Sequence, residues 1–257
     1  MTATPAVPHF TELQAPLSWR TADFISDLHL EAGEPETFEA WRRYMAATPA
    51  DAVFILGDLF EVWVGDDAAA APGFASDCAA VLKAAAAVRP VFFMHGNRDF
   101  LVGDGFLRSC NVTLLPDPTV FGFAGRRWLL THGDALCLAD TDYMKFRDLV
   151  RSPGWQRDFL AQPLAQRQAI AREIRGESES RKRKATVYAD VDEAFALAWL
   201  EAADAQAMIH GHTHKPADHA LGQGGRTVLS DWDAAAHPPR LEALRLTAAG
   251  AQRIALA

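Results

Sequence analysis

The feature that most constrains the fold of this chain is a short apolar run, residues 53–56, which leads directly into Gly57 and Asp58. A short, wholly apolar run bounded by glycine is typical of a strand buried on both faces, in a sheet that helices cover. In such sheets the binding crevice lies outside the carboxyl ends of the strands, which is where Asp58 would lie. The sequence therefore predicts an α/β fold with Asp58 in its functional crevice.

Four more apolar runs along the chain lead into Asp, Asn or His in the same way. With Asp58, the polar side chains at these five termini form a set of seven: Asp27, His29, Asp58, Asn97, His132, His212 and His214. Asp27 and His29 are two residues apart, as are His212 and His214, so on a strand both members of each pair would point to the same face. We therefore expect all seven side chains to converge.

These seven side chains offer oxygen and imidazole ligands without a thiolate, a set that suits Mn²⁺, Fe or Zn²⁺. If Asp58 bridges two ions, each ion has four contacts. The first set would be Asp27, His29, Asp58 and His214, and the second would be Asp58, Asn97, His132 and His212. Two ions about 3.5 to 4 Å apart can clamp the attacking and leaving oxygens of an in-line phosphoryl substitution. The pattern therefore predicts dinuclear phosphoryl chemistry.

The chain reads as one domain, residues 1–257, because no internal repeat and no linker divides it. Periodicity and turn residues predict the remaining elements. We expect helices at 36–46, 76–88 and 191–202, a first strand at 22–30, a strand after Pro90, a short helix and an edge strand within 106–115, a hairpin from 120–123 and 127–130, and closing strands at 226–229 and 241–246.

Composition limits the possible functions. The net charge of −8 argues against general nucleic-acid binding. The three cysteines form no C-x-x-C pair, which argues against a disulfide framework, and we interpret Cys137 as a small buried hydrophobe. We find no signal-peptide pattern and no apolar stretch of the roughly 18 to 20 residues that cross a bilayer. We therefore expect a cytoplasmic protein whose membrane contact is peripheral.

Residues 140–200 have a different sequence pattern, with apolar side chains spread through short helical segments that prolines interrupt. From Lys145 to Lys184 the segment holds 11 Lys or Arg against 5 Asp or Glu, a formal charge of +6 in an acidic chain. One interpretation is a solvated helical insertion. The interpretation that we favour is a lid over an amphiphilic anionic ligand, or a contact with a membrane surface.

Several polar residues outside the set of seven have plainer interpretations. Glu61, Asp66 and Asp67 follow the Asp58 terminus, and we expect them to support the structure or to contact the metal ligands, rather than to bind metal themselves. His210 precedes a turn glycine and is expected to pack in the interior.

The termini carry recognisable motifs: Asp27-x-His29, Gly57-Asp58, Gly96-Asn97, His132-Gly133-Asp134 and Gly211-His212-Thr213-His214. Together they resemble the calcineurin-like metallophosphoesterase superfamily. Longer matches, such as Ile55-Leu-Gly-Asp-Leu-Phe-Glu61 and His95-Gly-Asn-Arg-Asp-Phe-Leu101, are similar to the UDP-2,3-diacylglucosamine pyrophosphatases of lipid A biosynthesis within it. The resemblance spans roughly residues 22–232. It implies a four-layer α/β/β/α sandwich with a helical lid insertion at about 140–200.

The resemblance also implies a reaction, in which metal-activated water attacks the UMP-side phosphorus of UDP-2,3-diacylglucosamine. The products would be UMP and 2,3-diacylglucosamine 1-phosphate. Two divalent ions, Mn²⁺ by expectation, would be the cofactors, and Asp58 and Arg98 the catalytic residues. Arg98 stands where the superfamily usually has a histidine, and it cannot donate a proton at neutral pH. A phosphate leaving group, whose second pKa is about 6, needs no such donor, so Arg98 favours cleavage of a pyrophosphate.

Substrate contacts follow from the same resemblance. They are expected at Asn97, Arg98, Asp140, Ser178, Lys184 and His212, with Tyr143 stacking in the pocket and the apolar insertion lining a chamber for the acyl chains. The implied partners are the lipid substrate and the cytoplasmic face of the inner membrane, with no nucleic acid, and we expect a monomer. The alternatives are another dinuclear nucleotide pyrophosphatase or phosphodiesterase, and a binding scaffold without turnover.

Overall fold

The computed structural model describes residues 6–184 and 190–256, and the side chains of all of these except residues 177–184. Two six-stranded sheets form its centre. The first has the order β1-β6-β7-β8-β10-β9, with bounds Thr11–Gln14, Thr119–Phe123, Arg126–Leu130, Ala207–His210, Gly224–Val228 and Ala217–Leu221. The second has the order β12-β11-β2-β3-β4-β5, with bounds Gly250–Ala255, Glu242–Thr247, Ala22–Ile25, Ala52–Leu56, Val91–Met94 and Thr113–Leu115.

An aromatic layer fills the space between the two sheets. The Phe54 ring stacks on Phe24 and on Phe92, with centroid distances of 4.7 and 4.6 Å, and it packs against Phe121 of the opposite sheet. These rings alternate along β2, β3 and β4 with side chains that face the other way, and those side chains are apolar except for Asp23 of β2.

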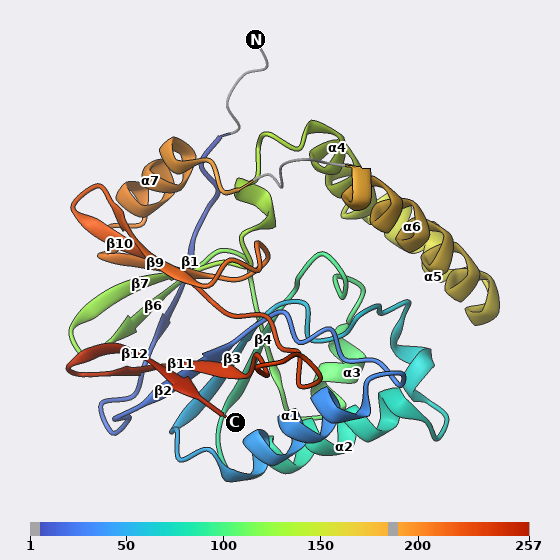
Figure 1. The fold of residues 1–257 in the computed structure, drawn as a ribbon, viewed down its shortest axis with the longest axis horizontal. Helices are drawn as coiled ribbons and strands as arrows, with labels where there is room; N and C mark the ends of the chain where they lie inside the picture. Colours follow the sequence, from blue (N-terminus) through green and yellow to red (C-terminus); the bar gives the residue numbers. More distant parts are fainter. Residues whose placement is uncertain (1–5, 185–189, 257) are drawn as a thin grey trace.

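Helices cover the outer faces of both sheets (Figure 1). The helices α1, α2 and α3 pack on the second sheet and α7 on the first, with bounds Pro35–Ala47, Phe74–Ala86, Asp104–Ser109 and Glu193–Ala202. The four layers confirm the expected α/β/β/α sandwich, and these helices and the β6–β7 hairpin lie where periodicity predicted them. Strands β1, β9 and β12 were not predicted, because each is an edge strand with few or no buried side chains and lacks an apolar run.

The prediction of a long first strand was wrong. Strand β2 ends at Ile25, and the chain then turns sharply, with φ of 56° at Asp27 and 49° at His29. The last histidine pair differs in the same way: β8 ends at His210, and His212 and His214 have φ of 67° and 52°. The same-face argument for two residues on a strand therefore does not apply, because these four residues lie in left-handed turns beyond the strand ends.

The segment after β7 contains three consecutive helices, α4, α5 and α6, with bounds Thr141–Val150, Pro153–Leu160 and Leu164–Lys184. The Asp140 and Ser152 side chains accept hydrogen bonds from Tyr143 N and Trp155 N, and thereby cap α4 and α5. Within the described ranges, no helix has both the length and the apolar character needed to cross a membrane.

Much of the apolar surface of these helices packs on the protein. Trp155 stacks on Phe159 at a centroid distance of 4.7 Å, and Trp155 also contacts Phe100 at 6.2 Å. Phe159 is buried in the cluster under α1–α3, whereas Leu149 and Leu160 are 57% and 41% exposed. The insertion is therefore seated on the sandwich, and these two leucines are its large exposed apolar side chains within the described residues.

We predict that Phe54→Ala lowers the free energy of unfolding by about 3 to 5 kcal/mol, because it opens a cavity in the layer that joins the sheets. Chemical denaturation measures the change. Val88→Ala, at a position that is 70% exposed, serves as the control and should change stability by less than about 0.5 kcal/mol. Equal effects of the two substitutions would contradict the role of this layer.

Candidate metal centre

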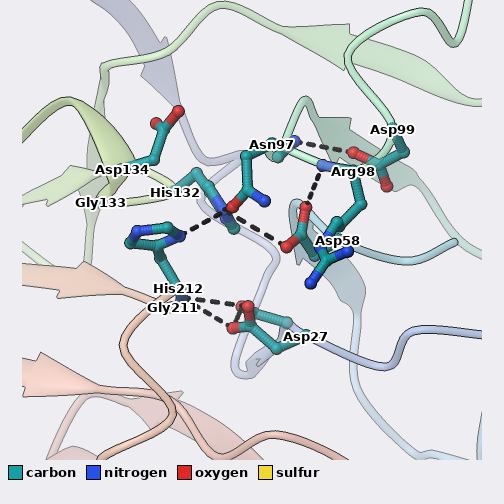
Figure 2. A network of polar contacts seen from close by, with 12 residues as sticks. Asp27, Asp58, Asn97, Arg98, Asp99, His132, Gly133, Asp134, Gly211 and His212 are labelled. Carbon is teal, nitrogen blue, oxygen red and sulfur yellow. Dashed lines mark hydrogen bonds and ion pairs between the residues drawn. The ribbon is translucent and has the colours of Figure 1, made fainter. Parts of the chain in front are cut away.

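Five strand ends meet at one edge of the sandwich. Strands β2, β3 and β4 are parallel in one sheet, and β7 and β8 are parallel in the other, so within each sheet the carboxyl ends lie at the same edge. Figure 2 shows the side chains of Asp27, Asp58, Asn97, His132 and His212 directed toward a common centre. The loops that carry them also pair with each other, because Asp27 N donates to Gly57 O at 3.1 Å.

One half of the centre consists of Asp27, His29 and His214. Their nearest ligand atoms all lie within 4.8 Å of one another. Two imidazole nitrogens, Nε2 of His29 and Nε2 of His214, face each other at 3.2 Å, and Asp27 Oδ1 lies 3.4 Å from His214 Nε2. The left-handed turns therefore direct both members of the first pair to one point, although by a different route from the predicted one.

The other half gathers around His132, and Asp58 lies between the two halves. Asp58 Oδ2 is 3.9 Å from His29 Nε2 and 3.8 Å from His132 Nε2. Asn97 Oδ1 lies 3.1 Å from His132 Nε2 and 2.8 Å from His212 Nδ1. A carboxylate that faces both halves has the position that a bridging ligand requires.

The protonation of the side chains fits a cation site. Burial lowers the pKa of His29, and burial together with His132 lowers the pKa of His212 to about 4, so the surroundings favour the neutral form of both rings. Burial also opposes the charge on His132, but the Asp58 and Asp27 carboxylates outweigh it and raise the pKa of His132 to about 9. Burial would raise the pKa of Asp27, yet hydrogen bonding and ion pairing with His214 hold it below its usual value. The buried carboxylates that raise the pKa of His132 equally favour a divalent cation, and a cation bound there would displace the proton of His132.

Two glycines allow the ligand loops to approach each other. A Cβ on Gly96 would collide with the carboxylate and backbone nitrogen of Asp58, and one on Gly211 would collide with Ser26 and Asp27. The glycines in the Gly96-Asn97 and Gly211-His212 motifs therefore set the spacing of the ligand loops.

A buried carboxylate fastens the loops after β3 and β4 together. Asp99, fully buried, accepts hydrogen bonds from Leu59 N and from Gly96 N, both at 2.8 Å. Burial, followed by repulsion from Asp58, raises the pKa of Asp99 to about 7. Sequence reasoning gave Asp99 no role, because the two amides that it joins are about forty residues apart in the chain.

A second buried carboxylate, Asp134, connects the loop after β7 to helix α4. It accepts hydrogen bonds from Tyr143 Oη at 2.6 Å, Arg147 Nε at 2.8 Å and Arg151 Nη2 at 3.3 Å. Burial opposes its charge, but Arg151 and Arg147 hold the pKa of Asp134 well below its usual range. Asp134 belongs to the His132-Gly133-Asp134 motif, which was the one sequence signal for its importance.

The polar residues that were expected to support the structure, or to pack in its interior, do so. Asp66 accepts hydrogen bonds from the backbone nitrogens of Gly103 and Phe106 at the start of α3, and Asp67 pairs with Arg167 of α6. His210 is fully buried, and its Nδ1 contacts Gly211 O. Cys137 is buried too.

Only some of the residues expected to bind substrate lie beside the candidate metal centre. The Arg98 backbone nitrogen donates to Asp58 Oδ1 at 2.8 Å, and the Tyr143 ring lies 5.8 Å from the His212 ring. Asp140 is exposed at the start of α4. The side chains of Ser178 and Lys184 lie outside the described residues.

With this geometry established, comparison with known proteins decides the family. The sequence profile described as calcineurin-like phosphoesterase matches residues 21–216, a span that contains all seven candidate ligands. The chain belongs to the calcineurin-like phosphoesterase family. The predicted family is therefore confirmed.

Curated relatives within this phosphoesterase family share a name. The UDP-2,3-diacylglucosamine hydrolase of Ralstonia nicotianae is 45% identical over 235 residues, which cover 87% of this chain and 88% of the relative. The proteins of the same name from Chromobacterium violaceum and Xanthomonas axonopodis pv. citri are 45% and 43% identical. They cover 81% and 82% of this chain, and 89% and 91% of their own lengths.

We predict that Gly96→Ala displaces Asp58, lowers the free energy of unfolding by about 1 to 3 kcal/mol and weakens binding of a divalent cation roughly tenfold or more. Denaturant titration and calorimetry measure the two effects. Gly154→Ala is the matched control, because a Cβ there meets no atom within 4 Å. If Gly96→Ala behaved like Gly154→Ala, the close packing of the two loops would not set the ligand spacing.

Proposed function

We propose that this chain hydrolyses the pyrophosphate bond of UDP-2,3-diacylglucosamine, giving UMP and 2,3-diacylglucosamine 1-phosphate in lipid A biosynthesis. The observation that carries the proposal is the convergence of the seven side chains on one partly buried centre, in a chain 45% identical to relatives named for this substrate. The centre supports phosphoryl chemistry, and the relatives support the choice of substrate.

In this proposal Asp27, His29, Asp58 and His214 hold one divalent ion, and Asp58, Asn97, His132 and His212 hold the other. We propose Mn²⁺ for both, because a mixed set of carboxylates, amide and imidazoles suits it. When bound, the ions supply positive charge at the phosphates and activate water. Asp58 holds the two halves of the centre at a fixed separation, since its carboxylate faces both.

Arg98 neutralises charge on the pyrophosphate as the bridging oxygen leaves. Its side chain is 16% exposed, its backbone nitrogen donates to Asp58 Oδ1, and its Nη1 lies 3.9 Å from Glu61 Oε1, which places the guanidinium beside the centre. A fork of N–H donors matches two phosphate oxygens at once. The departing phosphate monoester needs no proton from the protein near neutral pH.

The sugar phosphate would contact Asn97, Arg98 and His212 at the centre, and Asp140, Ser178 and Lys184 on the insertion. Tyr143 would stack in the same pocket, because Asp134 fixes its hydroxyl and its ring lies beside His212. The basic insertion, which carries the exposed Leu149 and Leu160, would contact the cytoplasmic face of the inner membrane and receive the acyl chains, with the protein acting as a monomer.

We predict that the protein with Mn²⁺ converts UDP-2,3-diacylglucosamine to UMP and 2,3-diacylglucosamine 1-phosphate, and that excess chelator stops the reaction. Mass spectrometry identifies the products. UDP-glucosamine, which lacks the acyl chains, is the matched substrate. Equal rates on the two substrates would instead support the alternative, a general nucleotide pyrophosphatase.

Replacing the residue shared by both halves should abolish turnover. We predict that Asp58→Ala lowers the rate on the order of 1,000-fold or more, which is about 4 kcal/mol of activation free energy. Circular dichroism should show an intact fold, because the substitution removes a buried charge without breaking an apolar contact. Activity within tenfold of the wild type would exclude Asp58 as a bridging ligand.

Removing the guanidinium should slow the reaction without removing metal. We predict that Arg98→Ala lowers kcat by roughly 30- to 1,000-fold, about 2 to 4 kcal/mol, by analogy with the loss of one oxyanion donor. Arg108→Ala, at an arginine whose side chain is 74% exposed on α3, should leave kcat unchanged. A change below twofold for Arg98→Ala would refute the proposed charge neutralisation.

A further inference from the structure

Glu61 joins the metal centre to the helical insertion. It lies in the loop after β3, the loop that also carries Asp58, and its side chain is 15% exposed. One carboxylate oxygen, Oε2, lies 2.9 Å from Nδ1 of His29. The other, Oε1, forms an ion pair with Arg175 of helix α6 and lies 3.9 Å from Nη1 of Arg98.

The contact with His29 affects which of the two ring nitrogens carries the proton. Nε2 faces the centre, 3.9 Å from Asp58 Oδ2, whereas Nδ1 faces Glu61 on the opposite side of the ring. The approach of Glu61 is not aligned as a hydrogen bond, so the interaction is mainly electrostatic. A negative charge beside Nδ1 favours the tautomer with the proton there and leaves the lone pair of Nε2 free for a metal.

The contact with Arg175 involves both the side chain and the backbone of Glu61. In addition to the ion pair, Arg175 Nη1 donates to Glu61 O at 2.9 Å. Two helical turns earlier, Arg167 of the same helix donates to Val64 O and pairs with Asp67. Helix α6 is thus docked by two arginines on residues 61–67, just beyond the ligand Asp58.

We propose that Glu61 is a positioning residue that couples the docking of helix α6 to the metal affinity of His29. Arg175 holds the carboxylate in the place from which it orients His29, so undocking of α6 weakens metal binding although no ligand is removed. This inference rests on the proposed metal centre. Because coupling between two sites is reciprocal, metal binding must strengthen the docking of α6 by the same factor.

A second guanidinium, that of Arg98, also lies near the Glu61 carboxylate, with its Nη1 3.9 Å from Oε1. A shift of the carboxylate toward Arg98 would loosen His29 and occupy the group that we assign to the phosphates. The position of α6 would therefore affect both metal binding by His29 and phosphate binding by Arg98.

The test measures Mn²⁺ affinity by calorimetry in the full chain. Glu61→Gln should weaken binding roughly 10- to 100-fold, as for other residues that orient a metal-bound histidine. Arg175→Met should weaken it roughly 5- to 50-fold. The double variant should bind Mn²⁺ no more weakly than the single variant with the lower affinity, because both substitutions break the same chain of contacts. Arg172→Met, at an exposed arginine on the same helix, is the matched control and should bind like the wild type.

Hydrogen exchange provides a second readout that a purely structural role would not change. Saturating Mn²⁺ should slow exchange of the backbone amides of residues 167–176 in the wild type and in Arg172→Met, but not in Glu61→Gln. Asp58→Ala should show no Mn²⁺ effect, because it disrupts the centre itself.

The outcomes separate the two proposals. If the wild type did not bind Mn²⁺, the proposed metal centre would fail. If the wild type bound Mn²⁺ and Arg175→Met bound it equally well, with Mn²⁺-dependent protection of α6 unchanged, the coupling would be refuted while the proposed function stood. Thermal unfolding of each variant confirms that it is folded during the measurement.

Discussion

The structure depends on two buried carboxylates that lie close together and repel each other. Asp27 and Asp58 are fully or almost fully buried, and their oxygens, with a nitrogen of His132, lie within 4.8 Å of one another. Repulsion between carboxylates is strong where water is excluded, so each needs nearby positive charge or donors. Backbone amides supply part of the compensation, from His212 to Asp27 and from Arg98 to Asp58. The surrounding imidazoles supply more, and a divalent cation would complete it.

The sequence locates the strand ends that meet at this candidate centre because each follows a short, mainly apolar strand, a signal that depends on local pattern alone. It predicts the path of the backbone less well. Nothing in the pattern around Asp27 or His214 shows that the strand has ended and that the residues adopt left-handed turns. Edge strands such as β12 are hard to predict because none of their residues needs to form a buried apolar run, and β12 has no buried residue. The contacts of Asp99 and Asp134 could not be predicted, since their partners become neighbours only after the sheets pair.

The helical insertion shows the limits of reading amphipathic segments from sequence. An apolar, basic stretch suggests a surface for lipid, yet Trp155 and Phe159 are used to attach it to the sandwich. Its arginines act in a similar way: Arg147 and Arg151 bind Asp134, and Arg167 binds Asp67. Acidic residues of the strand-end loops therefore neutralise part of the positive charge, and the surface left for an anionic ligand is smaller than the formal charge indicates.

The position of the candidate centre between the two sheets has a consequence for how the protein unfolds. Three of the five strand ends belong to one sheet and two to the other, so a cation shared among them would act as a removable cross-link between sheets that also meet in the apolar layer around Phe54 and Phe121. Loading the centre would add stability in proportion to the logarithm of metal concentration over the dissociation constant. Removal of the ions by a chelator would then lower the stability of the whole sandwich, although the protein would remain folded without them.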